Sequence, residues 1–141
     1  MIALPRLLKL QWFYIILGVG YNIISYIIVM SGGQQLSTTE PLSGGIAMMM
    51  YGLFLISAYK GQFRLYRMLM FFAILIFGWG GIGIHLVNYT HDPSLYASLF
   101  AWILAVGINV YGILLSGLAL FGRFVDDRKI ASEITVNQKN V

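Results

Sequence analysis

Four stretches of this sequence contain no aspartate, glutamate, lysine or arginine, and each is about as long as a membrane crossing. They cover approximately residues 11–30, 42–59, 68–87 and 97–122. A helix needs around 20 apolar residues to cross about 30 Å of hydrocarbon. The second stretch is just long enough, and the fourth has length to spare. The four stretches therefore predict four transmembrane helices.

Other readings of the apolar stretches fit less well. They lack the period-2 alternation of barrel strands and contain no internal proline, so helices are favoured. Only 10% of the 141 residues are charged, whereas a soluble domain carries about a quarter. This excludes a soluble enzyme, a nucleic-acid binder and a disordered chain. The first stretch is too long for a signal peptide and is followed by no convincing cleavage pattern.

The basic residues predict how the chain crosses the membrane. All nine lie before the first stretch, between the second and third, or after the fourth: Arg6, Lys9, Lys60, Arg64, Arg67, Arg123, Arg128, Lys129 and Lys139. Positive residues are retained on the cytoplasmic side. We therefore expect both termini in the cytoplasm and an all-α, up-down-up-down bundle of four transmembrane helices. The expected location is the cytoplasmic membrane, or an organelle membrane in a eukaryote.

No connection between the stretches is long enough to form a separate domain. We expect a transmembrane domain over residues 1–123 and a polar cytoplasmic tail over 124–141, with at most a short helix around Val125–Thr135. Short connections place neighbouring helices antiparallel in a bundle. The sequence therefore predicts one bundle with one tail.

Small and polar residues recur at helical spacing and predict the inward faces, because membrane helices associate through small residues and interhelical hydrogen bonds. They are Ala101, Ala105, Asn109, Gly112, Ser116 and Ala119 in the fourth stretch, Gly18, Asn22 and Ser25 in the first, Gly78, Gly81 and His85 in the third, and Gly45 and Gly52 in the second. The run Gly78–Gly83 has the glycine spacing of a nucleotide-binding fingerprint, but no strand precedes it. We interpret it as a packing or kink element.

Polar side chains within the stretches are the candidate functional residues. Asn22 and Asn109 each follow Val-Gly-X near the middle of a helix, and their amides are expected to pair across the bundle. Tyr51 and Tyr111 are expected either to join that network or to line a pocket, since a buried hydroxyl needs a partner. Coordination of a substrate is the functional alternative to a purely structural role.

His85 is the one histidine inside a predicted span. An intramembrane ionisable group is a functional candidate as a proton carrier, ligand or quinone contact. The plainer interpretation is a neutral imidazole bonded to a neighbouring helix, which the lack of a second titratable partner favours. A metal site from His85, His91 and Asp92 has irregular spacing. We therefore predict no metal site and no cofactor.

Lys60, Arg64 and Arg67 alternate with aromatic residues in the second connection. Cations beside a membrane attract anionic lipid, and aromatics anchor the interface. These three residues are our candidates for contact with lipid headgroups.

The sequence contains no nucleophile–base pair, paired carboxylates or metal cluster that would support catalysis. We therefore expect a non-catalytic accessory or structural subunit of a larger membrane complex. Its partners would be the lipid bilayer and other membrane subunits or further copies of itself, and no nucleic acid. One alternative is a small oligomeric transporter or channel with a polar path through the bundle. A second is a quinone- or metal-contacting subunit of a membrane enzyme.

Overall fold

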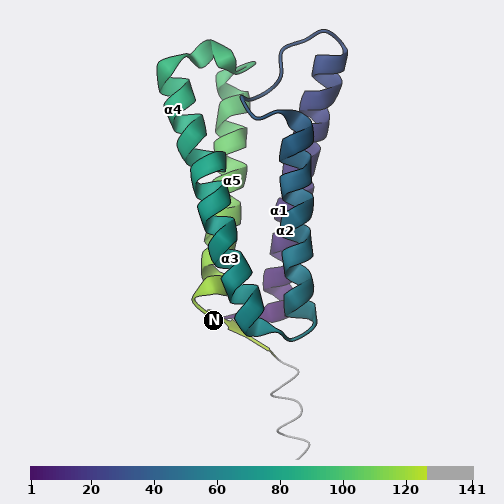
Figure 1. The fold of residues 1–141 in the computed structure, drawn as a ribbon, viewed down its shortest axis with the longest axis vertical. Coiled ribbons are helices and arrows are strands. Elements are labelled where there is room, and N and C mark those ends of the chain that lie inside the picture. The colour runs from purple at the N-terminus through teal and green to yellow at the C-terminus, as the bar shows by residue number, and fades with distance from the viewer. Residues whose placement is uncertain (127–141) are drawn as a thin grey trace, which may run out of the picture.

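The computed structural model describes residues 1–126, and four long apolar helical segments dominate it (Figure 1). Helix α1 covers Leu4–Met30, α2 covers Pro41–Tyr59 and α5 covers Leu99–Leu120, while the third segment runs through Phe63–His91. All four are long and apolar enough to cross a membrane. The predicted all-helical class, with four segments of membrane-crossing length, is confirmed at this level.

The third segment is interrupted by one π-helical turn. Helix α3 (Phe63–Gly78) leads into η1 (Trp79–Gly83), and α4 (Ile84–His91) continues from it. A π turn widens the helix by one residue and is common at functional sites. At Gly81 the backbone lies so close to the side chain of Asn109 that a Cβ atom there would overlap with it. The glycine run is thus a packing element, as predicted, and it brings η1 against α5.

The helix ends follow from local sequence signals. The carboxylate of Glu40 accepts hydrogen bonds from the backbone of Leu42 (2.9 Å) and Ser43 (2.7 Å) and so caps α2, and the Ser98 hydroxyl caps α5 in the same way. The last turns of α1, α2 and α5 are followed by glycines with positive φ: Gly32, Gly61 and Gly122. Glycine adopts this left-handed conformation without strain and so ends a helix.

Helix α1 begins at Leu4, seven residues before the predicted boundary at Gln11. The predicted span was limited to residues without charge, whereas the helix itself is longer. A helix continues into the interface when long basic side chains extend back toward water, and Pro5 is tolerated in the first turn. Arg6 and Lys9 are therefore part of α1.

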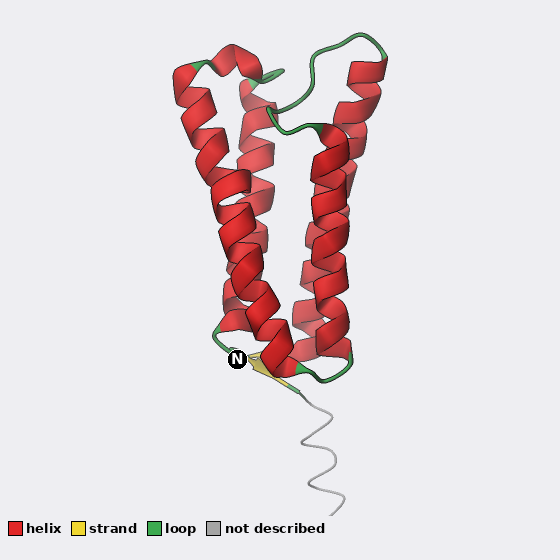
Figure 2. Cartoon of the chain, viewed as in Figure 1, coloured by secondary structure: helices red, strands yellow, loops and turns green. Residues whose placement is uncertain are grey.

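The two ends of the described chain meet in a short parallel pair of strands (Figure 2). Strand β1 (Ile2–Ala3) pairs with β2 (Phe124–Val125). The ring of Phe124 packs against the rings of Phe63 and Tyr66. The predicted tail helix placed Val125 in a helix, but it lies in a strand. The remainder of that prediction, from residue 127 on, lies outside the described residues.

We call the end of the bundle that holds the N-terminus and the α2–α3 connection the basic end, and the opposite end the loop end (Figure 1). Among residues 1–126, all lysines and arginines belong to segments at the basic end: Arg6, Lys9, Lys60, Arg64, Arg67 and Arg123. The loop end is built from the connections 31–40 and 92–98. Helices α1 and α2 form one closely packed pair, and α3 and α5 form the other.

The predicted inward faces are largely correct. Every predicted small or polar position of α5, from Ala101 to Ala119, is buried. On α2, however, Gly45 is half-buried and faces open space, and its neighbour Gly44 is the buried residue. The helical spacing from Gly52 pointed to Gly45 instead of Gly44, because both residues are small and the spacing does not distinguish them.

Candidate functional site

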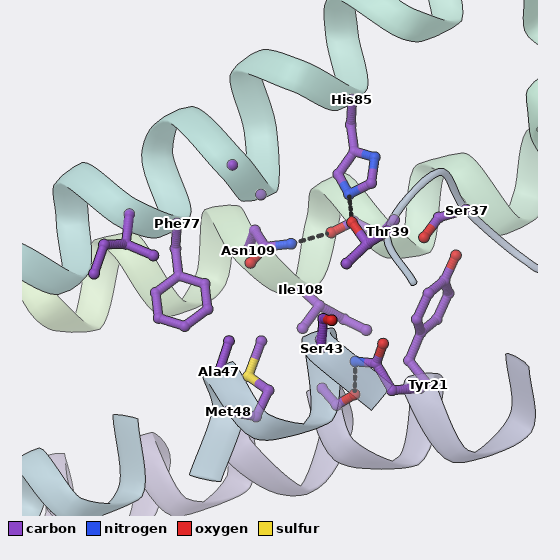
Figure 3. Close-up of a pocket in the computed structure, with 17 residues that line it drawn as sticks. Tyr21, Ser37, Thr39, Ser43, Ala47, Met48, Phe77, His85, Ile108 and Asn109 are labelled. Atoms are coloured by element: carbon purple, nitrogen blue, oxygen red, sulfur yellow. Dashed lines mark hydrogen bonds between the residues drawn. The ribbon is translucent and has the colours of Figure 1, made fainter. Parts of the chain in front are cut away.

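A cavity of ≈ 200 Å³ lies in the loop-end half of the bundle. Its walls come from all four membrane-spanning segments and from Ser37 and Thr39 in the connection before α2. Figure 3 shows His85 and Asn109 on one side of this space, with Tyr21, Ser43 and Met48 on the other. We call it the loop-end cavity. It unites three of the predicted candidates, Asn22, His85 and Asn109, in one site.

Asn22 and Asn109 occupy equivalent positions in the two helix pairs. Nδ2 of Asn22 donates to the Gly18 carbonyl and Nδ2 of Asn109 to the Ala105 carbonyl, each at 2.8 Å and each four residues back on the same helix. Each side chain also lies directly against a glycine of the packed partner, Gly44 for Asn22 and η1 for Asn109. The predicted pairing of the two amides with each other is wrong, because each amide is bonded within its own helix.

His85, on α4, is 3% exposed, and its ring is within hydrogen-bonding distance of residues in both loop-end connections. Its Nδ1 lies 2.8 Å from the Tyr96 hydroxyl and its Nε2 lies 3.4 Å from the Thr39 hydroxyl. The backbone carbonyl of His85 accepts from Trp102 at 3.1 Å. The predicted hydrogen bond of the imidazole to a neighbouring helix is not found, because the partners of its ring, Thr39 and Tyr96, lie in the connections between helices. Burial raises the pKa of Tyr96, so its hydroxyl stays protonated.

The histidines and the carboxylate that were weighed as a metal site do not converge. His91 and Asp92 are exposed, whereas His85 points into the bundle. The Asp92 carboxylate instead accepts from the hydroxyl and the backbone N–H of Ser94, and these bonds lower its pKa. Within residues 1–126 no group of three or more histidine, aspartate or glutamate side chains is arranged to hold a metal ion.

Tyr51 belongs to a separate polar cluster in the basic-end half. The Gln11 side chain is 0% exposed; it donates to the Tyr51 hydroxyl at 3.0 Å and accepts from the Tyr66 hydroxyl at 2.5 Å. The hydroxyls of Tyr51 and Ser116 are 3.0 Å apart. Sequence reasoning missed Gln11 because it was taken only as the boundary of an apolar stretch. A lone amide at the edge of such a stretch was the available signal.

Tyr111, the other predicted tyrosine, lies outside both clusters. It is half-buried, its hydroxyl is 3.4 Å from the Leu10 carbonyl, and its ring meets that of Phe13 edge to face. It therefore neither lines the loop-end cavity nor joins the network around Tyr51.

A layer of aromatic rings separates the cavity from the basic-end cluster. Tyr14, Tyr51 and Phe77 contact one another edge to face, with ring centroids 5.0–6.0 Å apart. Tyr14 and Tyr51 are at most 1% exposed. We call these three residues the aromatic layer. Since they fill the centre of the bundle, the cavity is closed toward the basic end.

The lining of the cavity contains no aspartate, glutamate, lysine or arginine. The Glu40 carboxylate lies beside it and accepts from the backbone N–H of the lining residue Ser43 at 2.7 Å. The candidate headgroup contacts Lys60, Arg64 and Arg67 are exposed at the basic end. Nε of Arg67 donates to the carbonyl of Leu120 at 2.7 Å and so caps the end of α5. The cavity thus has a mostly apolar lining with several uncharged polar groups.

Comparison with known proteins gives no relative from which a role can be transferred. No protein-family model, curated protein or solved structure matches this chain.

Proposed function

We propose that this chain is a non-catalytic membrane protein that binds a compact, uncharged organic molecule in the loop-end cavity. The main support for this proposal is the cavity itself. It has amide and hydroxyl groups on several helices and no formally charged lining residue, and the aromatic layer closes it toward the basic end. Binding sites of this kind are mostly apolar, with a few placed polar groups that orient the ligand.

The lining sets the charge of the ligand. An unpaired ion transferred from water to a low-dielectric site costs several kcal/mol even after relaxation. Among the lining residues only His85 is ionisable near neutral pH, and both its ring nitrogens have neighbours within hydrogen-bonding distance. Ions, amino acids and phosphates are therefore poor ligands for this cavity.

The opening of the cavity favours a ligand that arrives from the lipid. Exposed residues of its lining include Ser43 on α2 and Ile76 on α3, and Ile76 is 55% exposed. The cavity thus reaches the surface between these two helices, beside apolar side chains that suit hydrocarbon. A lipid-soluble molecule can enter there without first crossing into water.

We further propose that the basic end faces the cytoplasm and that the helices run up-down-up-down in the cytoplasmic membrane, or in an organelle membrane of a eukaryote. The clustering of the described cations at one end supports this orientation. Lys60, Arg64 and Arg67 would then contact anionic headgroups of the inner leaflet.

A role as an accessory subunit is the second proposal. An apolar groove of ≈ 580 Å³ runs along α1 and α2, lined by residues such as Val19, Ile23, Ile46 and Met49. At Gly45, in the wall of this groove, a Cβ atom would meet nothing within 4 Å. A helix of another subunit can therefore approach the backbone closely at this point.

Transport would need a route past the aromatic layer. The geometry therefore favours binding over conduction, and a transporter would have to rearrange Tyr14, Tyr51 and Phe77. A contact with a quinone in a membrane enzyme fits the same cavity without this change.

The proposal is tested by ligand-dependent thermal unfolding of the full chain in lipid nanodiscs. A ligand that binds only the folded state raises the unfolding temperature. We expect 4-methylphenol to do so and 4-methylbenzoate, a charged ring of similar size, to have no effect. Ala47→Phe fills the cavity and should abolish the shift, whereas Ile56→Phe, on the exposed face of α2, should retain it. Equal shifts in both variants would contradict binding in the cavity.

Purification in mild detergent followed by mass analysis tests the subunit proposal. Stoichiometric foreign subunits, or a defined homo-oligomer, are the expected result. A lone monomer under these conditions would contradict it.

A further inference from the structure

The two asparagines of the loop-end cavity are oriented by bonds that fix which atoms remain available. Each Nδ2 lies 2.8 Å from a backbone carbonyl of its own helix. A carbonyl oxygen can only accept, so the nitrogen must face it. An amide nitrogen carries two hydrogens, and one is used in this bond. Asn22 and Asn109 therefore each keep one N–H group that can be donated elsewhere.

The acceptor atoms of the same side chains differ in their surroundings. Oδ1 of Asn109 accepts from the Tyr14 hydroxyl at 3.4 Å. Oδ1 of Asn22 lies directly against Gly44 on α2. Each amide thus keeps one N–H donor, and the two donors belong to opposite helix pairs. A ligand that bears acceptors at two positions complements both walls.

The lining also contains hydroxyl groups, on Tyr21, Ser37, Thr39 and Ser43. The Tyr21 hydroxyl donates to the Ala101 carbonyl at 3.0 Å and is also hydrogen-bonded to the Ser37 side chain. A serine or threonine hydroxyl can rotate to donate to a ligand or to accept from it, whereas the spare N–H groups of Asn22 and Asn109 can only donate. The groups of fixed chemistry therefore favour a ligand with acceptors.

The remaining walls suit a flat ring. Met48, Ile76, Phe77 and Ile108 supply apolar surface between the two asparagines. A cavity of about 150 Å³ lined by apolar side chains holds a benzene molecule, and this one measures ≈ 200 Å³. One substituted six-membered ring fits, and a chain attached to it would leave through the opening beside Ser43 and Ile76.

We infer that the ligand of the loop-end cavity is an uncharged ring with carbonyl acceptors on opposite sides, the chemistry of a 1,4-quinone head. Asn22 would donate to one carbonyl and Asn109 to the other, and the ring would lie against the apolar wall. This inference rests on the proposed function and specifies the ligand class of the same site.

The test compares three molecules of similar shape with the full chain in nanodiscs. Tetramethyl-1,4-benzoquinone has two acceptors, tetramethylhydroquinone has two donors, and 1,2,4,5-tetramethylbenzene has neither. We expect the quinone to bind at least about tenfold more tightly than the hydrocarbon, because it can accept two hydrogen bonds that the hydrocarbon cannot. Isotope-edited infrared spectra of the bound quinone should show its carbonyl stretch at a lower frequency than in lipid alone.

Matched variants assign the effect to residues. Asn22→Leu and Asn109→Leu should each remove most of the preference for the quinone and part of the infrared shift. Asn88→Leu is the control, since Asn88 bonds to Thr38 at the loop end and does not line the cavity. If Asn109→Leu fails to fold, Asn22→Leu, at a half-buried site, decides the question.

The outcomes separate this inference from the proposal beneath it. Equal binding of quinone and hydrocarbon, or tighter binding of the hydroquinone, would overturn the ligand class and leave binding in the cavity intact. An infrared shift that persists in both leucine variants would also overturn it. If none of the three molecules binds although 4-methylphenol does, the ligand class is wrong and the proposed function stands. If 4-methylphenol also fails to bind, both the inference and the proposed function are wrong.

Discussion

The two halves of this bundle contain similar polar residues and use them differently. In the basic-end half, Gln11 joins the hydroxyls of Tyr51 and Tyr66, so that an amide and two phenols satisfy one another. In the loop-end half, Asn22 and Asn109 bond back to their own helices and leave a space between them. Among the described residues no buried side-chain nitrogen or oxygen lacks a partner. A membrane bundle can therefore satisfy its polar groups either across helices, which closes it, or within them, which leaves room for a ligand.

The largest expected effect comes from overpacking the aromatic layer, which bounds the basic-end half of the bundle. At Gly112 an added Cβ would overlap with the ring of Tyr14, which is fully buried and has no space to move into. Overpacking of this kind costs about 1–3 kcal/mol or more. We expect Gly112→Ala to lower the free energy of unfolding by at least about 1 kcal/mol, as measured in a denaturant titration in mixed micelles.

Gly107→Ala is the matched control on the same helix. A Cβ at Gly107 meets nothing within 4 Å, so this variant should be neutral or up to about 1 kcal/mol more stable, as expected for alanine in a helix. Similar losses at Gly107 and Gly112 would show that helix propensity, and not contact with Tyr14, explains the effect.

The second prediction compares the two kinds of amide. Gln11→Leu removes the partner of two buried tyrosine hydroxyls and should cost about 2 kcal/mol, near the upper end of the range for membrane hydrogen bonds. Asn22→Leu removes one bond within a helix at a half-buried position and should cost well under 1 kcal/mol. Equal costs would remove the distinction between the closed and the open half.

The third prediction concerns the close approach that shapes the cavity. At Gly44 an added Cβ would overlap with the amide of Asn22. We expect Gly44→Ala to displace this side chain into the cavity, with about a tenfold loss of affinity for 4-methylphenol. Gly45→Ala, one residue along, meets open space and should leave the affinity unchanged. Loss of binding in Gly45→Ala alone would point to the outer groove as the binding site.

The smallest effect is the pH dependence of the cap on α2. Hydrogen bonds from the side chain and backbone of Ser43, and from the backbone of Leu42, lower the pKa of Glu40. A carboxyl with a lower pKa in the folded state contributes stability at neutral pH, which is lost as the pH falls through that pKa. Protection factors of the Leu42 and Ser43 amides should therefore decrease in acid. In Glu40→Gln this decrease should be absent; an identical decrease would exclude the cap as its cause.

The fold class could be predicted because it depends on patterns that the sequence displays directly. Charge-free stretches of membrane length indicated the helices, and small residues at helical spacing indicated the buried face of α5. The start of α1 at Leu4 could not be read from the charge-free stretch, since helices extend into the interface beyond their first basic residue. The choice between Gly44 and Gly45 depended on how α1 and α2 rotate against each other, which spacing along one helix does not specify.

The candidate site could be predicted only as a set of residues. Asn22, His85 and Asn109 were recognised because polar groups inside membrane spans are rare and costly. Their arrangement was not, since an asparagine has an equally good partner four residues back on its own helix as across the bundle. Gln11 was overlooked for a similar reason. Its partners Tyr51 and Tyr66 lie 40 and 55 residues away in the chain.

Side-chain amide signals offer the most direct comparison of the two halves. In protein labelled with nitrogen-15 at asparagine and glutamine, Asn22 and Asn109 report on the loop-end cavity, Gln11 on the closed cluster and Asn88 on the loop end outside the cavity. On titration with 4-methylphenol in nanodiscs, we predict saturable shifts at Asn22 and Asn109 while Gln11 and Asn88 stay unchanged. Shifts of equal size at Gln11, or none at the two asparagines, would contradict a ligand site confined to one half of the bundle.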